Sequence, residues 1–322
     1  SIENTPNAAT DSGNVTSLHQ VLHLPDHRAS LESLFQLLDL EIMILDHNEL
    51  SFVPENISQL TQLKTLSLYK NQLVALPESI WQLANLEILN VADNRITDFS
   101  ERIGDLTKLR MLDVGHNALT GLPESLGKLR RLTFLYLSNN CLTTLPSSMK
   151  NLGNLVYLNI TDNRLGSLPA WIGNLASLIE LRLYNNLLDS LPESLGHLTH
   201  LKELYLMNNQ LAALPRSTGN LASLKKLMPQ GNQLTALPDT IGNLTNLTDL
   251  DLRNNQLQTL PEGLGNLKKL RFLDLRANNL QHLPDSLGAL PNLDKLDLRW
   301  NKFAALPGWI EQLAQRGCTV FA

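Results

Sequence analysis

The chain has 322 residues, with 26 Lys+Arg against 31 Asp+Glu and a formal charge of −5. It lacks the basic excess that holds a phosphate backbone, and no run approaches the roughly 18 apolar residues of a membrane-spanning helix, so neither nucleic-acid binding nor membrane insertion is expected. The two cysteines, Cys141 and Cys318, form no CxxC, so no disulfide framework or cysteine-based metal site is indicated. The 75 Leu and 32 Asn make up a third of the chain, which predicts an internal repeat.

The N-terminal region differs from the rest of the chain. Residues 1–16 are polar and rich in turn formers, which predicts a disordered or extended lead. Residues 17–39 are expected to form an N-terminal cap, because repeat arrays need atypical ends. Within the cap, Leu18, Val21, Leu22 and Leu24 suggest a degenerate strand, and residues 30–38 suggest a short amphipathic helix.

Residues 40–315 consist of twelve units of 23 residues, marked by asparagines at a constant spacing with no insertion. The first half of each unit reads LxxLxLxxNxL, and its alternating LxL core predicts a short strand with one buried face. The second half reads LPxxIGxLxx, in which proline favours an extended or 3₁₀ return. The asparagines occupy positions 48, 71, 94, 117, 140, 163, 186, 209, 232, 255, 278 and 301.

Single units of this length cannot bury their leucines, so neighbours must stack into one continuous core. We number each motif from its first leucine, which makes the asparagine position nine. Its amide is expected to satisfy buried backbone groups and to form a structural ladder. Leucines at positions four and six face inward, so positions three, five, seven and eight should be exposed. Asn159, at position five, is therefore expected to be an exposed neighbour of the ladder residue Asn163.

One unit carries two departures from the motif. Pro229 occupies position six, where other units have Leu, Val or Ile, and Thr218 replaces the Ile or Leu of the preceding return. Proline cannot donate to the strand ladder, and both substitutions remove core side chains. A locally weak joint between repeats is expected.

The C-terminal end of the array changes again. Trp309, Ile310 and Leu313 are expected to begin another return. Residues 316–322 are expected to add a closing strand, in which Cys318 is a small buried residue.

The 23-residue unit with LPxxIGxLxxL resembles the short leucine-rich repeats of bacterial proteins and of eukaryotic Ras-suppressor and plant Ras-group proteins. The resemblance covers about six sevenths of the chain. It implies an α/β repeat solenoid, a right-handed horseshoe with a concave parallel β-sheet and short 3₁₀ or extended convex returns. Members of this family are scaffolds, adhesins, effectors or receptor arms, which implies protein binding without catalysis.

The expected concave face holds all five tyrosines and three of the five methionines. Large side chains with an apolar body and an adaptable or polar end are typical of protein-binding surfaces, although aromatic residues also favour strands in general. The sequence therefore predicts a partner-binding centre at Phe134, Tyr136, Tyr157, Arg182, Tyr184, Tyr205, Met207 and Met228.

A possible rim flanks this centre. The repeated LDLR motif brings together acidic and basic side chains in the last units, either as self-neutralising surface or as a charged edge that orients a partner. The rim residues are Tyr69, Met111, Asp251, Arg253, Asp274, Arg276, Asp297 and Arg299.

Catalytic and metal chemistry have weak support. Asp93, His116 and Ser138 fall on adjacent predicted strands, but an open sheet offers no oxyanion site. His19, His23 and His27 are spaced by four, yet Pro25 breaks the helix that this spacing would need to bind a metal. No nucleotide-binding or hydrolase motif occurs, so no catalytic residue, metal or cofactor is predicted.

The sequence as a whole favours a monomeric, non-catalytic module that binds another protein. No secretory signal opens the chain, and a cytoplasmic protein or a secreted effector is expected. Two alternatives stay open: the recognition arm of a larger kinase or ubiquitin-ligase effector, and a surface adhesin.

Overall fold

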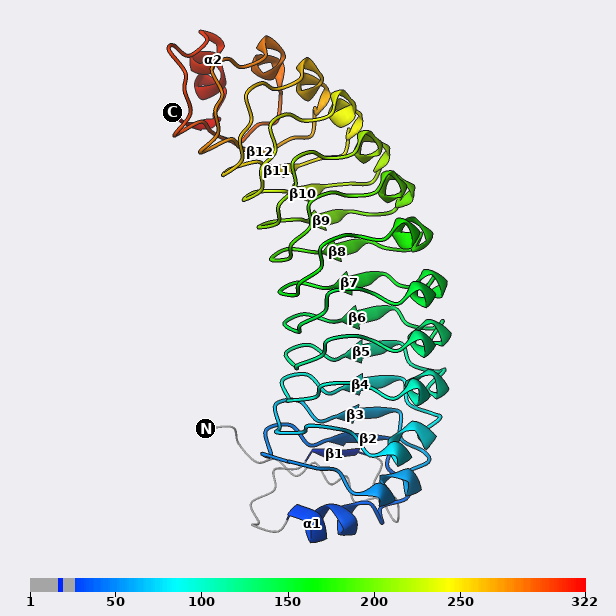
Figure 1. The fold of residues 1–322 in the computed structure, drawn as a ribbon. Coiled ribbons are helices and arrows are strands. Elements are labelled where there is room, and N and C mark those ends of the chain that lie inside the picture. Colours follow the sequence, from blue (N-terminus) through cyan, green and yellow to red (C-terminus); the bar gives the residue numbers. More distant parts are fainter. Residues whose placement is uncertain (1–16, 20–26) are drawn as a thin grey trace. The chain divides into compact units, whose positions relative to one another are not determined.

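The computed structural model describes residues 17–19 and 27–322. The chain divides into two compact units, 1–155 and 156–322. The predicted lead at 1–16 lies outside the described residues, as do Val21, Leu22 and Leu24 of the predicted cap strand. Both units are built from the same alternation of one three-residue strand and one short return (Figure 1).

The strands of the first unit are parallel, and neighbours in sequence pair with one another (Figure 1). From β2 onward the pairing register equals the repeat length, since Ile42 of β2 faces Thr65 of β3. The six strands are β1 (Ser17–His19), β2 (Ile42–Ile44), β3 (Thr65–Ser67), β4 (Ile88–Asn90), β5 (Met111–Asp113) and β6 (Phe134–Tyr136).

The returns of the first unit are 3₁₀ helices, as the LPxxIG pattern predicts. Four of them begin directly after a proline in extended conformation, whereas Ser100 replaces that proline before η3. Their bounds are η1 (Glu55–Gln59), η2 (Glu78–Gln82), η3 (Glu101–Asp105), η4 (Glu124–Lys128) and η5 (Ser147–Asn151).

The cap helix α1 spans His27–Leu34, earlier than the 30–38 expected from the sequence. Leu31 and Phe35, one helical turn apart, are fully buried, whereas Leu38 is exposed. The helix therefore ends next to its two buried residues, and the chain continues as a turn.

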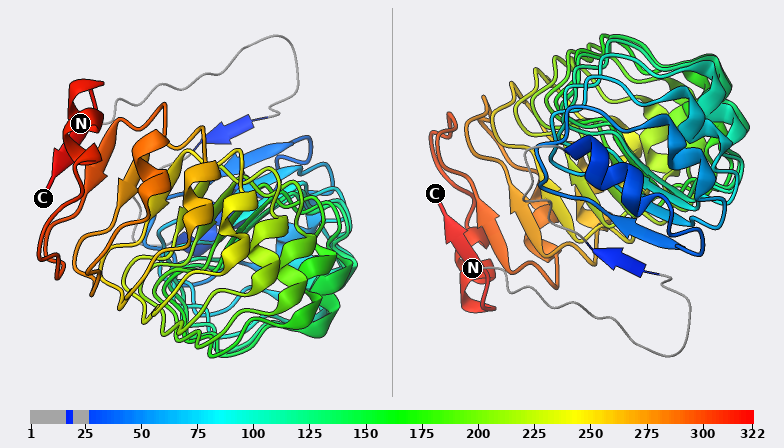
Figure 2. Two further views of the ribbon diagram at one scale, coloured as in Figure 1. Left: turned by 90° about the horizontal axis from the view of Figure 1, so that it is seen from above. Right: turned by 90° about the horizontal axis from the view of Figure 1, so that it is seen from below.

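The second unit repeats this organisation with eight parallel strands. They are β7 (Tyr157–Asn159), β8 (Glu180–Arg182), β9 (Glu203–Tyr205), β10 (Lys226–Met228), β11 (Asp249–Asp251), β12 (Phe272–Asp274), β13 (Lys295–Asp297) and β14 (Thr319–Phe321). The returns are η6 (Ala170–Asn174), η7 (Glu193–His197), η8 (Arg216–Asn220), η9 (Asp239–Asn243), η10 (Glu262–Asn266) and η11 (Asp285–Ala289). In Figure 2 these returns line up in order, from green to orange.

The last segment before β14 is an α-helix and not another 3₁₀ return, so that expectation is wrong. Helix α2 spans Trp309–Gln315 and buries Leu313. Its residues are mostly good helix formers, and the return glycine of the repeat motif is absent from them. Gly317, with a φ of 96°, follows as the C-terminal stop.

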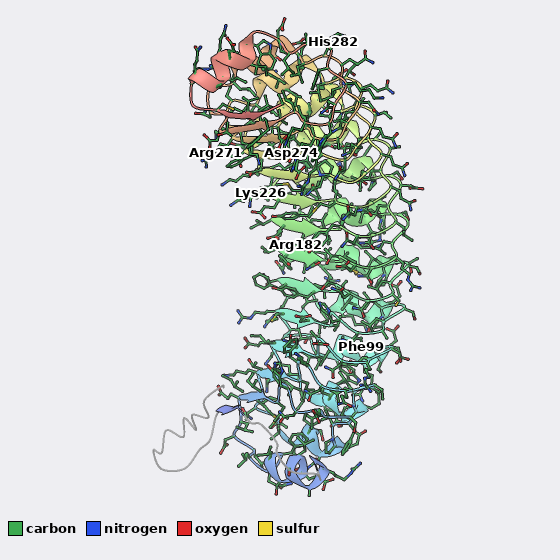
Figure 3. The ribbon with its side chains drawn as sticks, turned by 90° about the vertical axis from the view of Figure 1, so that its left-hand side faces the viewer. Phe99, Arg182, Lys226, Arg271, Asp274 and His282 are labelled. Carbon is green, nitrogen blue, oxygen red and sulfur yellow. The ribbon has the colours of Figure 1, made fainter. Side chains whose placement is uncertain are left out.

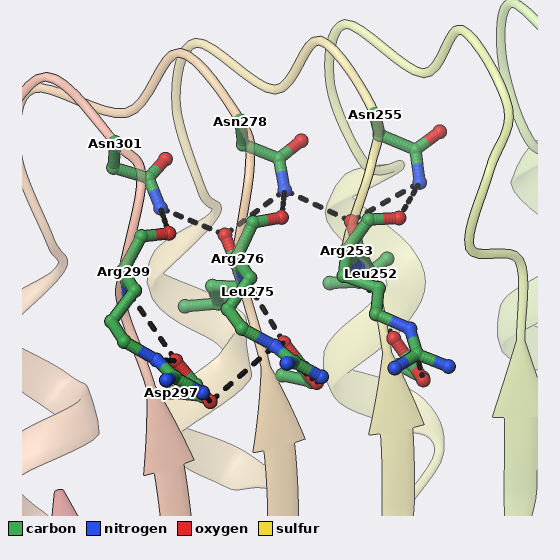
Figure 4. A network of polar contacts seen from close by, with 11 residues as sticks. Leu252, Arg253, Asn255, Leu275, Arg276, Asn278, Asp297, Arg299 and Asn301 are labelled. Atoms are coloured by element: carbon green, nitrogen blue, oxygen red, sulfur yellow. Dashed lines mark hydrogen bonds and ion pairs between the residues drawn. The ribbon is translucent and has the colours of Figure 1, made fainter. Parts of the chain in front are cut away.

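The asparagine ladder is confirmed. Asn209 is typical: its Oδ1 accepts the Leu188 N–H at 3.1 Å, and its Nδ2 donates to the carbonyls of Leu183 and Leu206 at 3.0 Å each. Figure 4 shows the donating side of the same arrangement at Asn255, Asn278 and Asn301. Each amide thus ties two neighbouring repeats together and satisfies backbone groups that would otherwise be buried and unpaired.

Position eight of every repeat has a left-handed backbone. The non-glycine φ values of this column lie between 51° and 61°, a region tolerated best by Asn, Asp and Gly. Gly231 belongs to the same column with a φ of 72°. The column comprises His47, Lys70, Asp93, His116, Asn139, Asp162, Asn185, Asn208, Gly231, Asn254, Ala277 and Trp300.

The inward positions four and six are buried as predicted, but some outward positions are buried too. Asn159 is only 9% exposed, which corrects its assignment as an exposed residue. Its Oδ1 accepts the Thr161 N–H at 3.0 Å, and its Nδ2 donates to the Tyr157 hydroxyl at 3.2 Å. A neighbouring tyrosine and a local turn therefore cover a side chain that strand alternation alone leaves open.

Candidate functional site

We call the surface formed by side chains at positions three, five and seven the strand face. Of the eight residues predicted as a binding centre, Phe134 and Tyr136 lie on β6 in the first unit, where Phe134 is 41% exposed and Tyr136 is half-buried. The other six lie on or directly after β7, β8, β9 and β10 in the second unit, and all six are half-buried. Half-buried aromatic and thioether side chains can be covered further by a partner.

Arg182 of β8 makes several contacts on the strand face of the second unit. Its guanidinium carbon lies 4.9 Å from the ring centroid of Tyr205 and 5.8 Å from that of Tyr157, within cation–π range of both. Its Nε also donates to Glu180 Oε1 at 2.5 Å. Figure 3 shows Arg182 at mid-height on the ribbon. The arginine is therefore held by rings from both neighbouring strands.

Hydrogen bonds and ion pairs extend this arrangement to the next strands. The Tyr205 hydroxyl donates to Glu203 Oε2 at 2.6 Å, and Lys226 Nζ lies 3.5 Å from Glu203 Oε1. Burial raises the pKa of Tyr205, with the Glu203 carboxylate as a further cause. Burial alone would lower the pKa of Arg182, but the Glu180 hydrogen bond raises it above its usual range. Both groups therefore keep their protons at neutral pH.

Two hollows lie on the strand face of the second unit. The first has a volume of about 320 Å³ and includes Tyr184 and Met207 in its lining, together with Gln230, Gly231 and Arg253. The second has a volume of about 190 Å³ and is lined by Met228, Leu250, Leu273, Asp249, Asp251, Asp274, Phe272 and Lys295. Three residues of the predicted centre and three of the predicted rim therefore border open space on this face.

The predicted rim residues of β11 to β13 form ion pairs. Arg276 pairs with Asp274 at 2.5 Å on its own strand and with Asp297 of the next strand at 3.3 Å. Arg299 binds Asp297 at 2.7 Å, and Arg253 binds Asp251 at 3.3 Å (Figure 4). The charges pair both within and between strands, so much of this surface neutralises itself.

The acidic members of this lattice differ in their environments. Burial raises the pKa of Asp251 to about 6, the nearby Asp274 carboxylate adds to the rise, and the Arg253 N–H opposes it. Burial also disfavours the charged form of Asp297, but the hydrogen bonds from Arg299 and the charge of Arg276 outweigh it and lower the pKa of Asp297. Asp251 is thus the carboxylate whose charge is least compensated.

The two rim residues of the first unit are each placed on its strand face. Tyr69 is half-buried and meets the His47 ring edge-on, with centroids 5.4 Å apart. Met111 of β5 is also half-buried. The aromatic and thioether character predicted for this face therefore extends to β3 and β5.

Two aromatic side chains near the C-terminal end, Trp300 and Phe321, both lie against Arg299 and were not among the predicted site residues. Trp300 is 69% exposed, and the Arg299 guanidinium lies 5.4 Å from its ring and 4.9 Å from that of Phe321. Lys295 also approaches Phe321, at 5.2 Å. The repeat pattern places Trp300 at position eight, so its exposure could have been predicted. The position of Phe321 depends on the closing strand β14, which lies outside the repeat pattern.

Of the side chains considered for catalysis, that of His116 contacts a residue outside the trio. His116 Nε2 is 3.1 Å from Asn139 Nδ2, and within the described ranges no side-chain hydrogen bond joins His116 to Asp93 or Ser138. For the histidine trio, His23 lies outside the described residues. Among residues 17–19 and 27–322, no cluster of three or more His, Cys, Asp or Glu has the arrangement to bind a metal.

Family comparisons agree with the repeat geometry. Models of leucine-rich repeats match almost the whole array: the "Leucine-rich repeat region" matches residues 14–114 and 98–190, "Leucine Rich repeats (2 copies)" match 176–219, and "Leucine rich repeat" matches 222–280 and 246–303. With this coverage, the parallel strands and the 3₁₀ returns, the chain belongs to the leucine-rich-repeat family. Members of this family are typically interaction modules without catalytic activity.

Solved structures show similar folds in bacteria and plants. The leucine-rich-repeat protein LIC12759 of Leptospira interrogans is 33% identical, with a TM-score of 0.66 over 90% of this chain and 86% of that one. The ectodomain of the Arabidopsis thaliana receptor kinase GASSHO1/SCHENGEN3 is also 33% identical, with a TM-score of 0.70 over 86% of this chain but only 38% of its own. An internalin of Listeria monocytogenes, at 24% identity and a TM-score of 0.69 over 91% of this chain and 92% of that one, shares the fold.

Two further comparisons are negative. No curated protein sequence matches the chain. In the part of the chain that the structure describes, neither α-helix has the length and apolar character to cross a membrane.

Proposed function

We propose that the chain is a non-catalytic recognition module that binds a partner protein on its strand face, the concave face of the predicted horseshoe. The observation that carries the proposal is the Arg182 side chain, held between Tyr157 and Tyr205 and paired to Glu180. Tyr, Met and Arg are enriched at the energetic centres of protein interfaces. Side chains that are already ordered lose less conformational entropy on binding, so a prearranged cluster favours affinity.

The relatives support protein recognition in general. The GASSHO1/SCHENGEN3 ectodomain is solved in complex with CASPARIAN STRIP INTEGRITY FACTOR 2. This chain spans 38% of that receptor chain, so the receptor's own partner is not carried over. The similarity does favour the alternative in which this chain is the recognition arm of a larger protein, and the same surface would serve there.

A capture experiment tests the proposal. The intact chain and a variant with Tyr136, Tyr157, Tyr184 and Tyr205 changed to Ala are immobilised, and retained proteins are identified by mass spectrometry. A matched control changes four exposed asparagines at the ends of returns to Ala: Asn151, Asn174, Asn220 and Asn243. A partner should be retained by the intact chain and the asparagine variant and lost from the tyrosine variant. Equal retention by all three would refute strand-face binding.

A further inference from the structure

We infer that the hollow of about 190 Å³ on the second unit is a subsite for a basic side chain, a lysine or arginine that the partner presents. The inference rests on the proposed function and adds the chemistry of one contact. The hollow is lined by residues of β10 to β13 on the strand face. Because β10 pairs with β9, the hollow lies next to the strands that hold the Arg182 cluster.

Apolar groups form the floor and two sides of the hollow. Leu250 and Leu273 point inward from β11 and β12, so these two strands form its floor. Met228 of β10 and Phe272 of β12 project from the strand face on either side of β11. Phe272 is 39% exposed. The apolar stem of a long side chain can therefore be buried between them.

Three carboxylates also line the hollow: Asp249 and Asp251 on β11, and Asp274 on β12. Asp249 and Asp251 are two residues apart on one strand and share a face, and Asp251 lies opposite Asp274 in the strand register. Burial raises the pKa of Asp251, and the negative charge of Asp274 adds to the rise. Negative charge is thus crowded around the hollow, and a cation placed there would be attracted.

Asp249 is the carboxylate that lacks a counter-charge. Each of the other carboxylates at positions three and five of the second unit pairs with an arginine or lysine. Within residues 17–19 and 27–322, Asp249 has no ion pair, and its Oδ2 accepts a hydrogen bond from the Thr248 hydroxyl at 2.6 Å. Lys226 faces Asp249 in the strand register, but its Nζ lies 3.5 Å from Glu203 Oε1.

The basic residue in the lining does not replace the missing partner. Lys295 of β13 lies with its Nζ 5.2 Å from the ring centroid of Phe321 on β14. In the strand order, β14 is on the side of β13 opposite to β12 and β11. The ammonium group of Lys295 is therefore held at the far side of its strand from Asp249.

These charges select one class of side chain. A partner's carboxylate would be repelled by the three aspartates, and an apolar side chain would cover Asp249 without a counter-charge. A neutral amide or hydroxyl could donate a hydrogen bond but would leave the negative charge uncompensated. A lysine or arginine supplies both a cation for Asp249 and an apolar stem for Met228 and Phe272.

The test uses small probes in place of the partner. The chain is labelled with ¹³C in its methionine methyl groups and titrated separately with the N-acetyl methylamides of lysine, arginine, norleucine and glutamine. The Met228 methyl should shift saturably with a basic probe, and the tighter of the two identifies the side chain that the subsite takes. The Met111 methyl of the first unit should stay unchanged. Norleucine and glutamine should bind at least about tenfold more weakly, the effect of one hydrogen bond to a charged group.

Two charge-matched variants sharpen the test. Asp249→Asn removes the unpaired charge and keeps an oxygen that can accept the Thr248 hydrogen bond. Asp239→Asn removes the same charge from the exposed start of η9, outside the hollow. Both variants should keep the melting temperature of the intact chain. Only Asp249→Asn should weaken the basic probe, by about tenfold.

The contrary outcomes are separable from those of the proposed function. A Met228 methyl that does not shift, norleucine or glutamine binding as tightly as the basic probes, or an undiminished affinity in Asp249→Asn would overturn the basic subsite. Because the titration needs no partner protein, each of these results leaves a tyrosine-dependent capture intact. A capture that does not depend on the tyrosines would instead remove the proposed function.

Discussion

The ring of Tyr205 on β9 lies 4.9 Å from the guanidinium of Arg182 on β8, and its hydroxyl is engaged by Glu203 on its own strand. The contact joins neighbouring strands through side chains that are only partly exposed. We predict that Arg182→Gln and Tyr205→Leu are coupled in a double-mutant cycle by about 0.5–1 kcal/mol, the range of a partly exposed cation–π contact. Urea unfolding of the four species measures the coupling, and strictly additive effects would count against it.

The ladder gives a second prediction with an internal control. Asn209→Ala should lower the free energy of unfolding by about 1–3 kcal/mol, because it leaves the Leu188 N–H and the Leu183 and Leu206 carbonyls short of partners. Asn220 is exposed and is the last residue of η8, the return that follows Asn209. Asn220→Ala should therefore lower the free energy of unfolding by less than about 0.5 kcal/mol. Equal losses in a denaturant titration would contradict the assignment of position nine as the structural column.

Much of this fold follows from the repeat itself. The strand at each position three to five, the buried leucines and the asparagine ladder all arise from one 23-residue spacing, so they could be predicted from β2 to β13. The ends could not be predicted in the same way. The return before β14 forms the α-helix α2 and not a 3₁₀ helix, although η1, η2 and η5 also lack the return glycine, and α1 is positioned by the burial of Leu31 and Phe35.

The candidate site was predictable as columns but not as contacts. The tyrosines share one face because side chains alternate along each strand. The contacts of Arg182 with the Tyr157 and Tyr205 rings depend on ring orientations, which the repeat spacing does not specify. The burial of Asn159 likewise depends on the Tyr157 hydroxyl. The hollow that Gly231 helps to line is formed by residues of four repeats, so it becomes visible only when these repeats are stacked in register.

The raised pKa of Asp251 gives a prediction about pH. Burial favours its neutral form in the folded chain, with a pKa of about 6, whereas an unfolded aspartate has a pKa of about 3.9. Between these values the folded state binds more protons, so the contribution of Asp251 to stability falls as the pH rises from about 4 to about 6. Asp251→Asn should therefore gain stability relative to the intact chain as the pH rises through this window, as measured by urea unfolding.

Asp297 provides the contrast of opposite sign. Its pKa is lowered by Arg299 and Arg276 despite its burial, so its stabilising contribution is present above the unfolded pKa and is lost as the pH falls. Asp297→Asn should be destabilising at neutral pH and lose part of that penalty in acid. If both variants showed the same pH trend, the assignment of the two environments would be wrong.

The last prediction concerns the expected weak joint at Pro229. In the neighbouring repeats the position-six N–H bonds to the next strand, as Leu206 does with the Met228 carbonyl at 2.9 Å and Leu252 with the Asp274 carbonyl at 2.8 Å. Pro229 has no N–H, and the pairing of β10 with β11 ends one residue early, at Leu227 and Leu250. The ladder resumes at Gly231, whose N–H donates to the Arg253 carbonyl at 3.0 Å.

The return before Pro229 adds a second defect. Thr218 is 1% exposed, and its hydroxyl has no hydrogen-bond partner among the described residues. A lost strand hydrogen bond and a buried unpaired hydroxyl both weaken the interface between adjacent repeats. Amides of residues 217–231 should therefore exchange with deuterium faster than those of residues 194–208, the equivalent stretch one repeat earlier.

Two repairs make this prediction decisive. Pro229→Leu restores an N–H that can reach the Asp251 carbonyl, and Thr218→Ile replaces the unpaired hydroxyl with an apolar group like those of the other returns. Each should raise the free energy of unfolding by about 1 kcal/mol and slow exchange in residues 217–231, because each removes one unsatisfied polar group from the core. Leu206→Pro, which creates the same gap one repeat earlier and leaves Pro229 in place, should extend the fast exchange to residues 194–208. Equal protection of the two stretches in the unaltered chain, or repairs that leave it unchanged, would show that the repeats tolerate Pro229 without a weak joint.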